Sequence, residues 1–166
     1  PVQSQDFHAN LYNGMIHPLI PYTLRGAIWY QGEANAGSHK EAKLYRKMLE
    51  NLTQSWREDW NDTLSFYAVQ LVNFMAPVKS PIQDSGWAHI RQSFLDYHKD
   101  VEKAGIAVGI DVGDASDIHP KDKQTIGYRL AQQALVHDYK FDRVPGGPIY
   151  ETMKVKDDQA ILYFSD

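Results

Sequence analysis

The sequence predicts an α/β fold in which a parallel sheet carries helices on its faces. Three short apolar segments have the length and composition of buried strands, at 24–30, 64–71 and 104–112. Three longer segments repeat apolar residues at helical spacing, at 40–60, 86–103 and 121–139. Because each strand is followed by a helix, we expect parallel strands with helices packed against them.

The first strand and helix follow an irregular start. Residues 1–23 are polar and rich in turn formers, and we expect no regular element there. The segment LRGAIWY at 24–30 predicts the first strand, and the polar loop QGEANAGSH follows it. Apolar residues then recur every three or four positions along 40–60, which is typical of a long amphipathic helix.

The remaining segments repeat this order and end in a different pattern. LSFYAVQL at 64–71 and AGIAVGIDV at 104–112 are apolar and β-branched, as buried strands are. After the last helix, a Gly-Gly-Pro run at 146–148 breaks the chain. The segments 149–155 and 160–164 flank an Asp-Asp pair, and we expect them to form a β-hairpin.

Charge and composition argue against several classes of protein. The 166 residues carry a net charge of −4, which favours neither nucleic acid nor an anionic membrane surface as a partner. No apolar run approaches the roughly 18 residues that a membrane-spanning helix needs. The absence of cysteine excludes disulfides and thiolate chemistry within this sequence.

His119 occupies a position that suits a catalytic base. It ends the loop GDASDIHP after the third strand, and we expect Pro120 to open the next helix. Ligand crevices of open α/β sheets lie at the carboxyl ends of the strands, and imidazole transfers protons near neutral pH. A histidine hydrogen-bonded within its own loop explains the spacing equally well. Asp117 or Asp114 could orient the ring as the acid of a triad does, and a site without such an acid also fits.

A second polar loop follows the first strand, at the same predicted edge of the sheet. The residues Gln31, Gly32 and Asn35 offer amide side chains and a glycine N–H, which are groups that stabilise an oxyanion. Glycine also allows a substrate to approach the backbone closely. On spacing alone, a simple polar turn is the more common interpretation of such a loop.

The sequence shows neither a recognised metal-ligand spacing nor a recognised motif for a nucleophilic serine. The residues Asp111, Asp114, Asp117 and His119 match no established ligand spacing, and we expect no metal. An acyl-ester hydrolase needs a nucleophile, and no serine lies in a G-x-S-x-G elbow. Ser116 is close to His119 in sequence, but a serine of the same loop rarely points its hydroxyl at Nε2.

Several motifs occur in the order found in one known family. They are LYNGMIHP at 11–18, WYQGEAN at 29–35, YR at 45–46, DIHPKDK at 117–123, GYRLA at 127–131, GPIY at 147–150 and MKV at 153–155. Together they cover nearly the whole chain. On these motifs the chain resembles the sialate 9-O-acetylesterase family, SGNH-type carbohydrate esterases that are related to certain acetylxylan esterases.

The resemblance implies a flavodoxin-like three-layer α/β/α sandwich that removes O-acetyl groups from sugars through an acyl-serine. The substrate would be 9-O-acetylated sialic acid or acetylated xylan, and no metal or organic cofactor is expected. The oxyanion segment of the family matches the QGEAN loop, in which Glu33 would be a structural anchor. His119 matches the catalytic base. The usual acid position of SGNH enzymes, three residues before the histidine, is Ser116 here, so Asp117 at minus two is the candidate.

The family's nucleophile segment, Gly-Asp-Ser or Gly-Gln-Ser, is absent from this sequence, and we expect it upstream of residue 1. Residues 1–145 would then be a partial esterase domain, followed at 146–166 by a hairpin that leads into a further β region. Such a piece is expected to be inactive alone and to self-associate through its incomplete sheet. The family is mostly secreted, periplasmic or lysosomal, and the localisation of this chain stays unknown. The alternative is a non-catalytic carbohydrate-binding or scaffold module with the same fold.

Overall fold

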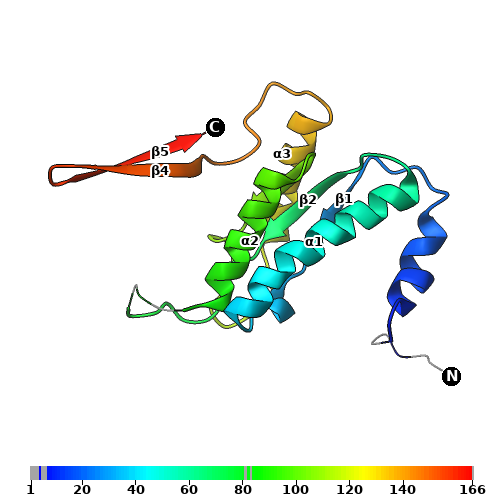
Figure 1. Cartoon of the computed structure of the whole chain (residues 1–166), viewed down its shortest axis with the longest axis horizontal. Helices are drawn as coiled ribbons and strands as arrows, with labels where there is room; N and C mark the ends of the chain where they lie inside the picture. Colours follow the sequence, from blue (N-terminus) through cyan, green and yellow to red (C-terminus); the bar gives the residue numbers. More distant parts are fainter. Residues whose placement is uncertain (1–3, 5–6, 81, 83, 166) are drawn as a thin grey trace.

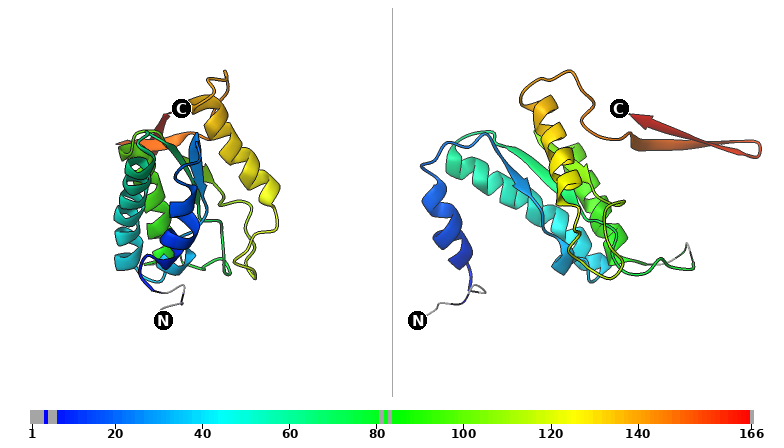
Figure 2. Two further views of the ribbon diagram at one scale, coloured as in Figure 1. Left: turned by 90° about the vertical axis from the view of Figure 1, so that its right-hand side faces the viewer. Right: turned by 180° about the vertical axis from the view of Figure 1, so that it is seen from behind.

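The α/β fold expected from the sequence is confirmed. The computed structural model describes residues 4, 7–80, 82 and 84–165. Three parallel strands form a sheet in the order β1-β2-β3, with bounds Gly26–Trp29, Ser65–Gln70 and Ala104–Val108. Helices α1 (His39–Trp60) and α2 (Gly86–Asp100) cover one face, and α3 (Lys123–His137) covers the other (Figures 1 and 2).

The central strand explains how these layers hold together. Strand β2 is buried along five of its six residues. Its alternating side chains serve two clusters, because successive residues of a strand point to opposite faces. Phe66 and Ala68 belong to the core shared with α1 and α2, whereas Tyr67 and Val69 pack toward Ile126 of α3.

Helix α1 has a capping residue at each end. The Ser38 side chain caps its start by accepting a hydrogen bond from the Glu41 backbone N–H. Asn61 ends it in the left-handed conformation, with φ of 47°. Ala42, Tyr45 and Leu49 lie buried at the spacing of one helical face. The predicted helix at 40–60 therefore differs from the observed one by a single residue.

The expected start of α3 is wrong. Pro120 does not open this helix, which begins at Lys123 with Asp122 as its N-cap. The Asp122 carboxylate accepts a hydrogen bond of 3.0 Å from the Thr125 N–H, so it satisfies one of the first-turn amides that have no carbonyl partner within the helix. Helix α3 also ends at His137, two residues earlier than expected.

Two other predicted elements extend too far at their carboxyl ends. Helix α2 ends at Asp100 because Val101 is extended. Strand β3 ends at Val108, and Gly109 after it lies so close to the β2 end that an added Cβ would be 2.8 Å from Val72 Cγ1.

Residues 12–19 form helical turns, where the sequence predicted no regular element. A π-helical segment, η1 (Tyr12–Ile16), leads into the 3₁₀ turn η2 (His17–Leu19). The Tyr12 hydroxyl donates to Asp59 of α1 at 2.7 Å, and Trp60 Nε1 donates to the Tyr22 carbonyl at 2.9 Å. These bonds fasten the segment to the end of α1.

The expected hairpin is confirmed. Strands β4 (Ile149–Lys156) and β5 (Gln159–Ser165) pair antiparallel as a sheet of their own. The turn places Asp157 at φ of 54°, in the left-handed region. The hairpin projects away from the three-layered body (Figure 1), and most of its side chains are exposed. Among the described helices, none is long and apolar enough to cross a membrane.

Candidate active site

Both predicted loops leave the sheet at the same edge. Because β1, β2 and β3 are parallel, the segments that follow them all start at their carboxyl ends. The loops after β2 and β3 are joined directly. The Gly113 N–H donates to Asn73 Oδ1 at 2.7 Å, and Phe74 forms an isolated parallel bridge with Asp114. This pairing holds the start of the His119 loop beside the end of the central strand.

The loop after β1 is held in shape by Tyr45 of α1. The Gln31 side-chain amide donates to Asn35 Oδ1 at 3.2 Å. The Tyr45 hydroxyl lies 2.7 Å from the Gln31 backbone oxygen and 3.0 Å from its Oε1, and it accepts a hydrogen bond from Trp29 Nε1 at 2.9 Å. Burial raises the pKa of Tyr45 to about 12, so this hydroxyl stays protonated at neutral pH.

Gly32 makes the sharp turn of this loop feasible. Its φ is +150°, a conformation that residues with a Cβ rarely adopt. An added Cβ would lie 3.3 Å from Ile90 Cδ1 and 3.4 Å from the rings of Phe94 and Tyr45. The turn presses its backbone against the core and leads directly into the 3₁₀ segment η3 (Glu33–Asn35). Glu33, the expected anchor, is thus the first residue of η3.

His119 is strongly exposed and lies beside Asp117. Its side chain is 85% accessible, and its Nδ1 is 3.5 Å from Asp117 Oδ1. The same oxygen accepts a hydrogen bond of 2.9 Å from the His119 backbone N–H. The carboxylate is therefore anchored within ion-pair distance of the ring nitrogen that the acid of a triad contacts.

The competing acid, Asp114, has partners of its own. It accepts hydrogen bonds from the backbone N–H and the hydroxyl of Ser116, at 2.8 and 2.7 Å. These bonds, the backbone one first, hold the pKa of Asp114 below its usual value. The Ser116 hydroxyl is consequently directed to a carboxylate and not to the His119 ring.

The predicted site residues form two groups. Within the described part of the chain, no hydrogen bond or ion pair joins the loop of Gln31 to the loop of His119. The nearest link is Lys123, whose Nζ lies 4.8 Å from the centroid of the Tyr30 ring. Tyr30 directly precedes Gln31, and its buried hydroxyl has no described partner. Burial raises the pKa of that hydroxyl.

The acidic run does not gather into a metal centre. Asp111 is held by Arg129, whose Nη2 donates to Asp111 Oδ2 at 2.7 Å, and a second hydrogen bond from Nη1 to Oδ1 completes a two-point ion pair.

A cavity of about 720 Å³ lies apart from the predicted site, between β3, α3 and residues 144–150. None of the predicted catalytic or oxyanion residues lines it.

Sequence reasoning missed Tyr45 and Lys123 as neighbours of the site. Tyr45 has the spacing of a core residue in α1, and nothing in that spacing indicates that its hydroxyl reaches a strand-end loop. Lys123 is the first residue of α3, and because the predicted helix began earlier, the direction of its side chain could not be predicted.

Comparison with known proteins places these features in one family. The family described as "Carbohydrate esterase, sialic acid-specific acetylesterase" matches residues 4–136. Human sialate O-acetylesterase is 31% identical over 171 residues, and the mouse protein is 34% identical over 137 residues. The alignments cover 93% and 74% of this chain, but only 32% and 25% of those relatives.

A solved structure agrees with these sequence relatives. The crystal structure of a carbohydrate acetylesterase from Xanthomonas citri matches with a TM-score of 0.83 and 38% identity, over 93% of this chain and 35% of that one. This chain therefore spans about a third of the length of the human and Xanthomonas proteins. On the family match and this shared fold, the chain belongs to the carbohydrate esterase family of sialic acid-specific acetylesterases.

Proposed function

We propose that this chain supplies the base and the oxyanion-binding turn of a carbohydrate O-acetylesterase, which removes O-acetyl groups from sugars. The observation that carries the proposal is that the loops of Gln31 and His119 follow parallel strands of one sheet and start at its carboxyl edge. Relatives named as sialate O-acetylesterases and a carbohydrate acetylesterase support an acetylated sugar as substrate. The two candidate sugars are the ones expected from the sequence, 9-O-acetylated sialic acid and acetylated xylan.

The chemistry assigns one role to each residue. Nε2 of His119 removes the proton of a serine hydroxyl as its oxygen attacks the acetyl carbonyl, and Asp117 beside Nδ1 favours the resulting imidazolium. The Gly32 N–H and the amides of Gln31 and Asn35 stabilise the oxyanion that forms. The bond between the acetyl carbon and the sugar oxygen then breaks while His119 gives its proton to that oxygen, so that the sugar leaves with a free hydroxyl and an acetyl-serine remains. In a second cycle His119 activates water, and acetate and free serine result.

The serine itself is proposed to come from a segment outside this chain. Ser116 is the serine closest to His119 in sequence, and its hydroxyl is bonded to Asp114. An SGNH-type sandwich with further strands beyond β1 agrees with the edge position of that strand and with Ile28, whose side chain is 70% exposed there. Under this proposal residues 1–145 are part of an esterase domain, and residues 146–166 lead into a following β region.

Acetate release by the full-length protein tests the proposal, with acetylated sialic acid and acetylated xylan in parallel. His119→Ala is expected to lower kcat by about 10²- to 10⁴-fold, which is the usual contribution of general acid–base catalysis. His8→Ala is the matched control, because His8 is exposed in the first residues and should leave kcat unchanged. Full activity of His119→Ala would refute the proposal.

Two further measurements separate the remaining alternatives. Asp117→Asn should lower kcat strongly and Asp114→Asn only slightly, if Asp117 is the acid; the reverse ranking would assign the role to Asp114. A full-length protein that binds the sugars in calorimetry and releases no acetate would instead be a carbohydrate-binding module with the same fold.

A further inference from the structure

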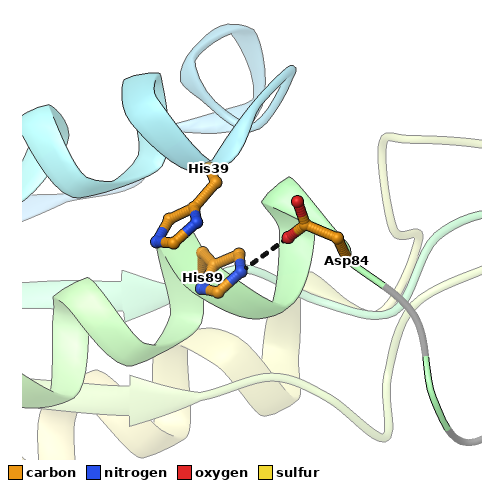
Figure 3. A group of neighbouring side chains, drawn as sticks. All are labelled: His39, Asp84 and His89. Atoms are coloured by element: carbon orange, nitrogen blue, oxygen red, sulfur yellow. Dashed lines mark hydrogen bonds and ion pairs between the residues drawn. The ribbon is translucent and has the colours of Figure 1, made fainter.

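Three potential metal ligands meet where α1 and α2 begin. His39 is the first residue of α1, His89 lies in the first turn of α2, and Asp84 directly precedes the Ser85 cap of α2. His89 Nε2 and Asp84 Oδ1 are 2.8 Å apart. The rings of His39 and His89 are stacked, with centroids 3.7 Å apart and planes inclined by 4°. Figure 3 shows the two rings stacked plane to plane, with the Asp84 carboxylate at the edge of the His89 ring.

We propose that His39, His89 and Asp84 bind a divalent transition-metal ion of the zinc class. One ligand atom from each residue lies within 4.8 Å of the other two. Zinc–nitrogen bonds of about 2.05 Å place tetrahedral ligand atoms about 3.4 Å apart. The ligand atoms would therefore need to approach by no more than about 1.4 Å. The stacked rings would also need to turn by side-chain rotation, so that the in-plane lone pairs of their nitrogen atoms converge on the ion. A water molecule would complete the fourth position.

The backbone around this cluster is held in place without a metal. Gly86 lies so close to the loop before α1 that an added Cβ would be 2.2 Å from the Ala36 carbonyl oxygen. The Ser93 hydroxyl donates to the Ala42 carbonyl at 2.8 Å and ties α2 to α1 in the core. The two histidines are thus brought together by helix packing, so little ordering remains to be done when a metal binds.

The donor set selects the kind of ion. Two imidazoles and one carboxylate suit zinc, copper, nickel and cobalt, whereas calcium and magnesium prefer oxygen ligands alone. Two helix N-termini lie at the cluster, and their partial positive charges disfavour a cation. The Asp84 carboxylate offsets this effect, so we expect all three side chains to be needed.

The ion would act as a clamp and not as a catalyst. It would join the starts of α1 and α2 close to η3, which carries Asn35 of the oxyanion turn. The esterase chemistry proposed above requires no metal, and this inference stands apart from it.

Calorimetric titration of the untagged full-length protein with Zn²⁺ tests the inference. We expect one ion per chain, with a Kd on the order of 1 μM or tighter. Zinc at a hundredfold excess over Kd should raise the Tm of the full-length protein by about 2 to 5 °C. Asp84→Asn and either His39→Ala or His89→Ala should weaken binding by about tenfold or more, while His8→Ala should not change it.

The comparison with the variants decides the outcome. Zinc binding that survives both His39→Ala and His89→Ala, or wild-type binding no tighter than theirs, would overturn the assignment. Circular dichroism of each variant without metal verifies that it folds, and Asp84→Asn removes a ligand without changing side-chain size. Because the readout is binding, it is independent of whether the protein releases acetate.

Discussion

At the scale of single residues, the proposed oxyanion-binding turn at 31–35 depends on a tyrosine from a neighbouring helix. The Tyr45 hydroxyl contacts both oxygens of Gln31 and also accepts a hydrogen bond from Trp29. It therefore fixes which side of the Gln31 amide presents its N–H groups. A residue placed in this way acts on the site through Gln31 and would not touch the substrate.

Tyr45→Phe should impair both stability and turnover. Removal of the hydroxyl leaves the Trp29 indole N–H and the Gln31 oxygens without this partner, at a cost of about 1–3 kcal/mol in the free energy of unfolding. A misplaced Gln31 should lower kcat about tenfold, with little change in KM. Tyr97→Phe is the matched control, because its buried hydroxyl bonds Thr53 in the core; it should lower stability alone. Equal kcat values for the two variants would show that Tyr45 does not position Gln31.

The sequence predicts candidate-site residues that lie in loops after strands, but it does not predict those placed by packing between elements. Gln31 and His119 could be singled out because each lies in a polar loop after a buried strand. The part played by Tyr45 depends on the turn at Gly32, whose φ of +150° follows from tertiary contacts. No local sequence pattern predicts this contact between Tyr45 of α1 and the loop of Gln31.

At the scale of elements, one ion pair joins the end of β3 to α3. The Arg129 guanidinium donates to Asp111 and, at 2.7 Å, to the Val108 carbonyl at the end of the strand. The hydrogen bond from Arg129 is the main reason that the pKa of Asp111 falls to about 2. The ionised carboxylate is therefore favoured in the folded chain.

This shift makes a specific part of the stability depend on pH. A lowered folded-state pKa contributes stability that is present above the unfolded pKa and is lost as pH falls through the folded value. Urea midpoints of wild type and Asp111→Asn should therefore differ at about pH 5 and converge toward about pH 2. Asp142→Asn, at an exposed carboxylate, is the control and should leave the midpoint near that of wild type. A difference that stays constant over this range would contradict the expected link.

Element types were predictable from periodicity, whereas several boundaries were not. Apolar spacing located all three long helices, because burial of one face requires it. The predicted start of α3 was wrong because proline and aspartate both commonly precede or open a helix. The hydrogen bond from the Thr125 N–H makes Asp122 the cap. The helical segments near the amino terminus were missed because their bonds to α1 come from residues far away in sequence.

At the scale of the whole molecule, the sheet has an open side. Among the strands of the described residues, β1 pairs with β2 alone, and Ile28 on it is 70% exposed. An unpaired edge with an apolar side chain favours pairing with another strand.

The 1–166 polypeptide should accordingly self-associate as its concentration rises. Ile28→Lys should shift the equilibrium toward monomer, because charge on an edge strand opposes strand pairing. Val78→Lys is the control, since Val78 is exposed in the loop after β2 and does not belong to strand β1. Sedimentation velocity measures the distribution; a wild-type polypeptide that stays monomeric at high concentration would rule out this association.

The contact between Asn73 and Gly113 limits which substitutions the loop after β3 accepts. A methyl group at position 113 would fall 1.9 Å from the Asn73 carbonyl oxygen, so even alanine would drive the two segments apart and carry the imidazole with them. Substitutions meant to reshape this region should therefore leave Gly113 and Asn73 unchanged, because the loop that carries His119 depends on their contact.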